Sequence, residues 1–327
     1  MSEKKSKLTM KDVAREAGVA IGTVSKVLNG LPVGEEYRIK VEEAVEKLNY
    51  RVNSYAKGLR ENKTFTVAVI VPNLITPYFA KLVNCILKSL TAHKYRMMLC
   101  ASDYNPAQEQ EFIYIAEQKK VDGIICLSYS LDLDISEDIP FVSIDRYFGS
   151  KASCVASDNY GGGVLAVEKL AECGCKNLAF MRIGSKRTNE PNKRKDGFIN
   201  ACERLGLDYT LKIVDDGTPY SAFEDFLREH CHDNKLDFDG IFCVTDSLAY
   251  QICRFLKGMD IRIPEDVQII GFDGIRSFGN LDLYCSTIVQ PVEEIAETCV
   301  ELLLNKPKSA SLVCLPVNYA YGGTTKA

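Results

Sequence analysis

Charged and aromatic side chains follow many of the short apolar runs between residues 66 and 273. Aromatic rings stack on the apolar faces of sugars, while guanidinium and carboxylate groups form paired hydrogen bonds with neighbouring hydroxyls. These residue types therefore suit the binding of a small polyhydroxylated molecule. The candidate ligand contacts are Tyr78, Phe79, Asp103, Arg146, Arg194, Tyr220, Asp246 and Asp273.

The apolar runs alternate with helical patterns, as in TVAVIVP at 66–72 and NLAFMRI at 177–183. Short continuous apolar runs between helices predict parallel sheets covered by helices on both faces. Open parallel sheets bind ligands beyond the carboxyl ends of their strands. The pattern therefore predicts an α/β core whose strand ends bring the candidate residues together.

An internal repeat divides this core into two similar halves. VDGIICLS at 121–128 matches FDGIFCVT at 238–245, and PFVSID at 140–145 matches VQIIGFD at 267–273. We expect two doubly wound parallel-sheet subdomains with a ligand cleft between them. The first is predicted to span about 64–160 plus 291–318, and the second about 161–290 plus the C-terminal end.

The first fifty residues have a different pattern, which predicts three short helices. Thr9-Met-Lys-Asp12 has the form of a capping box with Asp in place of Glu, so a helix should start at Met10, and Gly18 supplies its left-handed stop. A second helix follows almost at once, and a third runs from about 34 to 49. The apolar positions expected to cover the first two helices are Ile39, Val41, Val45 and Leu48.

Two helices joined by a tight glycine corner form a helix-turn-helix, whose second helix enters the DNA major groove. The outer face of that helix is small and polar, with Gly22, Ser25, Lys26 and Asn29, and with Thr23 at its edge. Residues 1–63 carry 13 Lys and Arg against 9 Asp and Glu, a net charge of +4, which leaves −8 for the rest of the chain. This asymmetry favours nucleic-acid contact. A generic three-helix cap is the alternative.

The segments LTMKDVAREAGVAIGTVSKVLNG and VEEAVEKLNYRVNSYAKGL closely resemble the N-terminal region of the LacI/GalR family of bacterial transcription regulators. The resemblance implies that Ile21 and Gly22 select the operator sequence and that neighbouring residues contact its backbone or base edges. The DNA contacts that it implies are Thr9, Ile21, Gly22, Thr23, Ser25, Lys26, Asn29, Tyr50, Asn53, Ala56 and Leu59.

Three positions depart from the usual family pattern. Ala20 stands where a Ser commonly caps the recognition helix, which weakens the start of that helix by about 1 kcal/mol. Lys26 replaces the commoner Arg, so a point charge takes the place of bidentate guanine recognition. Ile21 and Gly22 offer almost no hydrogen bonding. The operator sequence therefore does not follow from these residues.

Residues 51–63 form the predicted hinge between head and core. Asn53 is a good N-cap, and Ala56 and Leu59 share a face, but two turns of helix are too few to be stable alone in water. The resemblance implies that this helix folds only on the operator, paired with its dimer mate, and that Leu59 wedges into the minor groove. The alternative is a solvated spacer whose Leu59 packs on the core.

The resemblance continues over 64–327, where RKDGF at 194–198, GFDG at 271–274 and STIVQP at 286–291 match recurrent motifs of the family's effector domain. That domain resembles a periplasmic sugar-binding protein. The resemblance implies a homodimeric regulator, most simply a repressor of carbohydrate genes, whose operator affinity responds to a small effector. A sugar, a sugar acid or a sugar phosphate would suit Arg146 and Arg194, and no cofactor is expected.

Two local motifs suggest other ligands. Gly161 to Ala166 fit the G-x-G-x-x-A turn of dinucleotide enzymes, but the next apolar run lacks the acidic residue that would hold a ribose. Cys173-Gly-Cys175 and 230–232 (His-Cys-His) suggest a metal, but no second ligand pair stands at a finger-like spacing. We therefore expect neither a dinucleotide nor a structural zinc.

Two other classes of protein share the predicted core. A solute-binding protein would keep the cleft, but the lysine-rich start leads into no signal core and the N-terminal sixty residues would have no role. An enzyme is disfavoured because we find no nucleophile elbow and no histidine after a strand of the cleft. We expect a cytoplasmic protein, nucleoid-associated when it binds DNA, and a dimer rather than a tetramer because no leucine heptads follow the core.

Overall fold

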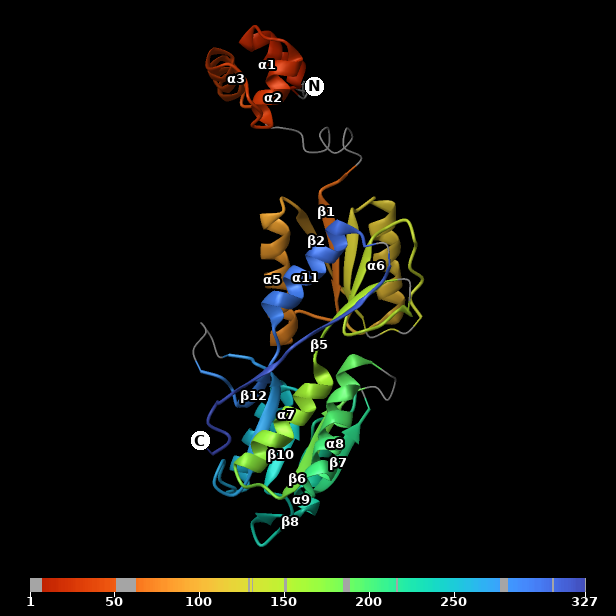
Figure 1. Ribbon diagram of the computed structural model, residues 1–327, viewed down its shortest axis with the longest axis vertical. Coiled ribbons are helices and arrows are strands. Elements are labelled where there is room, and N and C mark those ends of the chain that lie inside the picture. Colours follow the sequence, from red (N-terminus) through yellow and green to blue (C-terminus); the bar gives the residue numbers. More distant parts are fainter. Residues whose placement is uncertain are drawn as a thin grey trace, which may run out of the picture. The chain divides into compact units, whose positions relative to one another are not determined.

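A computed structural model describes residues 8–50, 63–128, 130, 132–149, 152–184, 189–215, 217–276, 282–307 and 309–326 (Figure 1). The chain divides into two compact units, one up to Thr64 and one from Phe65 onward. We call the first unit the head and the second the core.

The head consists of three helices, α1 (Met10–Ala17), α2 (Ile21–Leu28) and α3 (Glu35–Lys47). The capping box is present: the Thr9 amide and hydroxyl both donate to Asp12 Oδ2, at 2.9 and 2.7 Å. These bonds lower the pKa of the Asp12 carboxyl below its ordinary value. Gly18 ends α1 with φ 64°, the left-handed conformation that glycine adopts without strain. The predicted helix and its stop are confirmed.

The core of the head is made by residues that meet where the three helices cross. Val13, Val24 and Val41 are fully buried there, together with Ala44 and Tyr50. Ala20 leaves α2 without a side-chain cap, as its sequence position predicts. The prediction for Ile39 was wrong: its side chain is 45% exposed, because the buried face of α3 runs through Val41 and Ala44 and position 39 lies off that face.

The core contains two six-stranded sheets with related topologies (Figure 1). The first has the order β13-β5-β4-β3-β1-β2, with every neighbouring pair parallel. Its strands are β1 (Thr66–Val71), β2 (Arg96–Ala101), β3 (Gly123–Leu127), β4 (Phe141–Ile144), β5 (Ser153–Ser157) and β13 (Leu312–Leu315). Successive side chains of β1 alternate between its two faces, so helices can cover both.

Helices α5 (Pro77–Ala92) and α11 (Val292–Asn305) cover one face of this first sheet, and α6 (Pro106–Gln118) covers the other (Figure 1). Val67, Val69 and Val71 pack on the α5–α11 side. Ala68 and Ile70 pack on the α6 side. The apolar run at 66–72 therefore reads as continuous because both of its faces are buried.

The second sheet has the order β14-β12-β11-β10-β6-β7, with only the edge strand β14 antiparallel to its neighbour. Its strands are β6 (Asn177–Ile183), β7 (Asp208–Val214), β10 (Gly240–Cys243), β11 (Gln268–Asp273), β12 (Ser286–Val289) and β14 (Asn318–Ala320). Helices α7 (Asn159–Glu172), α8 (Lys193–Leu205), α9 (Ser221–Glu229) and α10 (Asp246–Gly258) pack on it. A short hairpin, β8 (Cys231–His232) with β9 (Lys235–Leu236), follows α9.

The sequence repeat maps onto equivalent strands of the two sheets. β3 and β10 hold the same place in the strand order, and so do β4 and β11. Asp122 and Asp239, the acids of the repeated DG pairs, both accept backbone amides at the start of a neighbouring strand: Phe65 in the first sheet, Asn177 in the second. Asp145 and Asp273, which end the second repeated motif, therefore occupy equivalent positions at the two strand ends.

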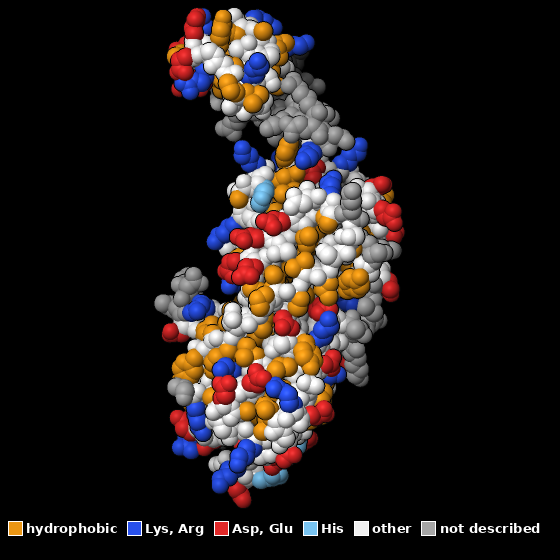
Figure 2. Space-filling model, in the orientation of Figure 1, with side chains coloured by type: hydrophobic (Ala, Val, Ile, Leu, Met, Phe, Trp, Pro, Cys, Tyr) orange, Lys and Arg blue, Asp and Glu red, His pale blue; other side chains and the backbone are white. Residues whose placement is uncertain are grey.

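The chain passes between the two subdomains at three places: from β5 to α7, from β12 to α11, and from β13 to β14. The last two crossings return the α11 and β13 segments to the first sheet. On the face of residues 65–327 seen in Figure 2, acidic and basic side chains are intermixed over both subdomains. The described part of the chain contains no helix long and apolar enough to span a membrane.

Candidate functional site

Acidic residues at the carboxyl ends of the strands have unusual backbone conformations. Asp103 after β2, Asp145 after β4 and Asp273 at the end of β11 have φ of 49°, 58° and 125°. Positive φ is uncommon for residues other than glycine, and such strain collects at functional sites. The strand ends that the sequence selects as a ligand site are therefore also where backbone strain is concentrated.

Arg194 is the best-held cation at these strand ends. Its guanidinium lies 3.5 Å from the centre of the Phe272 ring, donates from Nε to Asn159 Oδ1 and from Nη1 to the Val244 carbonyl, both at 2.7 Å, and is almost fully buried. Stacking on an aromatic face is a favourable environment for a desolvated guanidinium. The contacts fix the plane of the group, and none of these hydrogen bonds uses Nη2.

Close packing of α7 against α8 sets the position of Arg194. A Cβ on Gly163 would lie 2.1 Å from the Arg194 carbonyl oxygen, and a Cβ on Gly197 would lie 2.1 Å from that of Tyr160. Only glycine permits helix backbones to approach so closely. The glycines that mimic a dinucleotide-binding turn thus serve helix packing. Gly161 has its own reason, because the capping carboxylate of Asp158 lies 2.1 Å from where its Cβ would be.

Three buried aspartates surround Arg194, and burial is the main cause of their raised pKa values. The pKa of Asp145 rises to about 6, with Arg194 lowering it and Glu190 raising it. The pKa of Asp273 rises to about 7, again with Arg194 opposing the effect of burial. Burial and the charge of Asp273 raise the pKa of Asp246 well above its ordinary value. We call Asp145, Glu190, Arg194, Asp246 and Asp273 the strand-end cluster.

The strand-end cluster joins the two subdomains. The Glu190 amide, in the 3-10 turn η2 (Glu190–Asn192), donates to the Asp145 carbonyl at 3.2 Å. Asp145 also accepts a hydrogen bond from Asn159, and its buried Oδ1 has no hydrogen-bond partner among the described residues. An acceptor that is buried without a partner is costly, so this oxygen is suited to receive a donor from a ligand.

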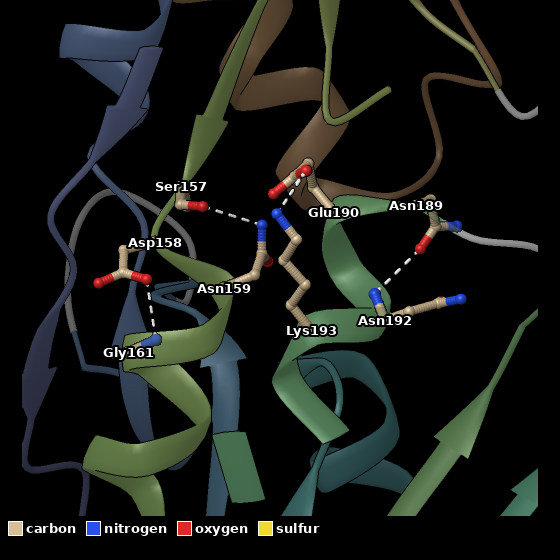
Figure 3. A network of polar contacts seen from close by, with 8 residues as sticks. All are labelled: Ser157, Asp158, Asn159, Gly161, Asn189, Glu190, Asn192 and Lys193. Carbon is tan, nitrogen blue, oxygen red and sulfur yellow. Dashed lines mark hydrogen bonds and ion pairs between the residues drawn. The ribbon is translucent and has the colours of Figure 1, made fainter. Parts of the chain in front are cut away.

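A polar network links the cluster to two of the chain crossings. Gln290, between β12 and α11, donates to Asp273 Oδ1 at 2.7 Å and accepts from Ser157 Oγ, also at 2.7 Å. Figure 3 shows Ser157 at the end of β5 next to Asn159, whose Nδ2 donates to the Ser157 carbonyl, and Lys193 paired with Glu190. The starts of α7 and α8 therefore meet at this junction.

Arg146 belongs to a second polar network, at the strand ends of the first sheet. Its Nε donates to the Ser128 carbonyl at 3.2 Å. The Ser128 hydroxyl donates to Glu109, a fully buried carboxylate of α6, which also accepts the hydroxyls of Ser102 and Ser130. A buried carboxylate with several hydroxyl donors is well satisfied and rigidifies its surroundings. Glu109 thus positions the ends of β2 and β3.

The predicted ligand contacts are not equally placed. Asp246 is fully buried, and its carboxylate accepts from Thr287 Oγ1 and from the Ile275 amide, both at 2.6 Å. This contradicts the expectation that it contacts a ligand directly: in this structure it positions the ends of β11 and β12. Tyr78 and Phe79 are buried in the core beside α11, whereas Asp103 and Tyr220 are exposed. Arg146, Arg194 and Asp273 are buried at the strand ends.

Four polar residues of this region were not predicted as site residues: Glu109, Asp145, Asn159 and Gln290. Asp145 carried a signal, because it precedes Arg146 and matches Asp273 in the repeat. Gln290 lies within STIVQP, a motif noted for its resemblance alone. Glu109 stands in the polar stretch PAQEQE, where the sequence gives no sign of which Glu is buried.

On the head, the predicted DNA contacts lie largely on one exposed helix. Ile21, Gly22, Lys26 and Asn29 are exposed on α2 or at its end, and Thr23 and Ser25 are half-buried. The Asn29 amide donates to the Ser25 carbonyl at 2.8 Å, and Thr9 is exposed at the start of α1. Tyr50 corrects the prediction, because its side chain is only 8% exposed and packs in the head's core. Asn53, Ala56 and Leu59 lie outside the described residues.

The cysteine and histidine motifs have other partners. All thirteen cysteines are free thiols, and Cys173 Sγ donates to the Lys326 carbonyl at 3.3 Å. His230 Nδ1 lies 2.9 Å from Asp237 Oδ2, across the β8–β9 hairpin. Within the described ranges, no group of three His, Cys, Asp or Glu side chains is arranged to hold a metal ion.

A helix-turn-helix head followed by a two-sheet core with buried guanidinium and carboxylate groups at its strand ends defines a class of protein, the DNA-binding regulators with a small-molecule-binding core. Family models agree with this class. Residues 9–53 match the bacterial regulatory proteins of the lacI family, and residues 64–305 match the periplasmic binding proteins and sugar binding domain of the LacI family. The chain belongs to the LacI family of transcription regulators and is not an enzyme.

Individual relatives agree with this assignment. The sucrose operon repressor of Lactococcus lactis is 30% identical, with 96% of this chain and 99% of that protein covered. A periplasmic binding protein/LacI regulator from Alkaliphilus metalliredigens, solved with D-xylulofuranose, is 26% identical with a TM-score of 0.69, covering 80% of this chain and 99% of the other. The Lac repressor dimer bound to operator, 19% identical with a TM-score of 0.79, shares the fold over 98% of this chain and all of that one.

Proposed function

We propose that this regulator represses a carbohydrate operon and that a small polyhydroxylated effector binds at the strand-end cluster. The observation that carries the proposal is the meeting of Asp145 from the first sheet with Arg194 and Asp273 from the second, all three buried at strand carboxyl ends. The relative named for sucrose and the neighbour solved with D-xylulofuranose support a carbohydrate effector. No cofactor besides this effector is required.

An effector held by residues of both sheets couples binding to subdomain geometry. A ligand that bonds Asp145 and Arg194 together stabilises the arrangement in which the two subdomains approach each other. Gln290 and Ser157 connect Asp273 with two of the chain crossings, so a change at the cluster also acts on the segments that join the subdomains. Operator affinity then changes only by the ligand's preference for one arrangement, and by linkage operator DNA changes effector affinity by the same factor.

DNA recognition in this proposal rests on the exposed face of α2. A homodimer places two copies of α2 on the half-sites of a pseudo-palindrome, with Ile21 and Gly22 at the positions that select bases. The hinge contacts Asn53, Ala56 and Leu59 stay predictions, as does the minor-groove wedge of Leu59. Because its operator is chromosomal, the protein acts in the cytoplasm, on the nucleoid when bound.

A thermal-shift screen of the full-length protein against neutral sugars, sugar acids and sugar phosphates tests the proposed site. A ligand at 100 times its Kd stabilises the core by about 2.7 kcal/mol, so the correct class gives a clear shift. Arg194→Met is expected to abolish the shift, because it removes the cation that lies between Asp145 and Asp273.

Arg204→Met is the matched control. Arg204 lies on the same helix, is half-exposed and pairs only with Glu168, so its loss should leave the ligand-induced shift unchanged. An effector whose shift survives Arg194→Met in a folded protein would contradict the proposed site. A protein that none of the sugars stabilises would contradict the proposed effector class.

A further inference from the structure

The strand-end cluster holds more acids than bases. Asp145, Asp246 and Asp273 are buried there with one guanidinium, Arg194, among the described residues. Glu190 is also buried and is paired with Lys193, the adjacent cation, at 2.8 Å. Once this ion pair is set aside, three carboxyl groups share a single positive charge. A buried excess of one sign is costly and is relieved by protonation or by hydrogen-bond donors.

Arg194 has little left to offer an anion. Its two described hydrogen bonds go to Asn159 and Val244, its face is covered by the Phe272 ring, and its charge acts on both Asp145 and Asp273. An anionic ligand placed against this guanidinium would also lie beside those two carboxyl groups. At an effective dielectric constant of about 20, like charges within several ångströms cost a few kcal/mol.

Hydroxyl donors fit the same place well. The buried Asp145 Oδ1 has no hydrogen-bond partner among the described residues, so it can accept a ligand O–H. Asp246 cannot turn toward a ligand without losing the Thr287 and Ile275 donors, and so it remains as a fixed acid behind the site. The cluster thus presents an acceptor in front and an acid behind.

We infer that the effector site selects neutral, hydroxyl-rich ligands and discriminates against their anionic derivatives, because Asp145, Asp246 and Asp273 outnumber the one guanidinium beside them. The inference rests on the proposed function and narrows it: of the sugars, sugar acids and sugar phosphates that suit two arginines, it keeps the first. The discrimination should grow as the pH rises, because burial and their mutual charge hold the pKa of Asp145 at about 6 and that of Asp273 at about 7, so both ionise further above neutrality.

Calorimetry on the full-length protein with matched pairs tests this inference. The pairs are ribose with ribose 5-phosphate, fructose with fructose 6-phosphate, and glucose with both glucose 6-phosphate and glucuronate. We expect the neutral member of the binding pair to bind at least about tenfold more tightly at pH 7.5, and the ratio to be smaller at pH 6. An anionic member that binds as tightly as its neutral partner, or more tightly, would overturn the inference.

Asp145→Asn sharpens the test. It removes one charge and keeps the shape, so the neutral ligand should bind more weakly and the neutral-to-anionic ratio should fall by about tenfold. Asp225→Asn, at an exposed acid of the same core, is the matched control and should change neither. Thermal unfolding of each variant shows that it is folded, and an unchanged ratio in folded Asp145→Asn would contradict the inference.

Failure of the proposed function would look different. If no sugar bound, the proposed effector class would be wrong, and inorganic phosphate would still decide the charge argument. Phosphate binding that Arg194→Met abolishes would contradict the inference, whereas phosphate binding by Asp145→Asn but not by the parent protein would support it.

Discussion

Asp145 and Asp273 occupy the same position in two related sheets, yet their surroundings differ. In the second sheet, an arginine is held by an aromatic ring and by glycine-mediated helix packing, with Phe272 under Arg194. In the first sheet, Arg146 is held through Ser128 by a buried carboxylate, Glu109. The comparison shows that one sequence repeat fixes strand ends of equal geometry, while unrelated contacts hold the cation at each.

These two means of positioning a cation should fail differently. Steric packing tolerates no added atom, so a small change in the second sheet is severe. A hydrogen-bond network loses one donor or acceptor at a time, so a change in the first sheet is graded.

Gly163→Ala is expected to have the largest effect. Its Cβ would meet backbone atoms, the Arg194 oxygen at 2.1 Å and the Phe198 nitrogen at 2.9 Å, so α7 and α8 must separate. We expect a loss of about 3 kcal/mol in the free energy of unfolding, together with lost effector binding. Chemical denaturation and the ligand-induced thermal shift measure these.

Gly258→Ala is the control for this change. Gly258 is the last residue of α10, and its Cβ would meet nothing within 4 Å, so the substitution should leave stability unchanged or raise it by up to about 1 kcal/mol. Equal effects at Gly163 and Gly258 would rule out the helix contact as the support of Arg194.

Glu109→Ala should have an intermediate effect. It leaves the hydroxyls of Ser102, Ser128 and Ser130 without their acceptor, so we expect the free energy of unfolding to fall by about 2 kcal/mol and effector affinity to weaken through Arg146. Glu111→Ala, at an exposed position of the same helix, should change both little. A folded Glu109→Ala protein with the parent's effector affinity would remove Glu109 from the site.

The pH dependence of stability gives the smallest expected effect. Asp145 and Asp273 have pKa values of about 6 and 7, above the ordinary 3.8, so the folded protein binds more protons than the unfolded chain between pH 4 and 7. Their contribution to stability is complete at low pH and is lost as the pH rises through 6 and 7. Asp145→Asn should reduce the fall between pH 5 and 8 by on the order of 1 kcal/mol.

Asp273→Asn should remove the part of the fall that lies at higher pH, because the folded pKa of Asp273 is the higher of the two. Free energies of unfolding of the ligand-free proteins at several pH values provide the measurement. Parallel curves for the parent and both variants would show that neither carboxyl group titrates abnormally.

Most of the fold could be predicted because it rests on local patterns. The capping box at Thr9 and Asp12 and the left-handed Gly18 fix α1, and the repeated DGI motifs fix equivalent strands. Ile39 shows the limit of such reasoning. An apolar residue two positions before the buried face of α3 satisfies a loose periodicity and still points to solvent.

The site was less predictable, because its contacts join distant segments. Strand-end position correctly brought Arg194 and Asp273 together, but Asp246, also at a strand end, is held behind the site by Thr287. That contact depends on how β11 and β12 pair, which no local pattern reveals. Glu109 and Gln290 are likewise defined by partners far away in the sequence.

The central claim is that occupancy of the strand-end cluster controls operator binding. Its most direct test is the affinity of the full-length protein for operator fragments from its own genomic neighbourhood, measured at fixed salt with and without the neutral sugar that stabilises the core. We predict that the sugar changes the operator Kd and that operator changes the sugar Kd by the same factor, with both effects lost in Arg194→Met. An operator affinity that the bound sugar leaves unchanged would contradict the account.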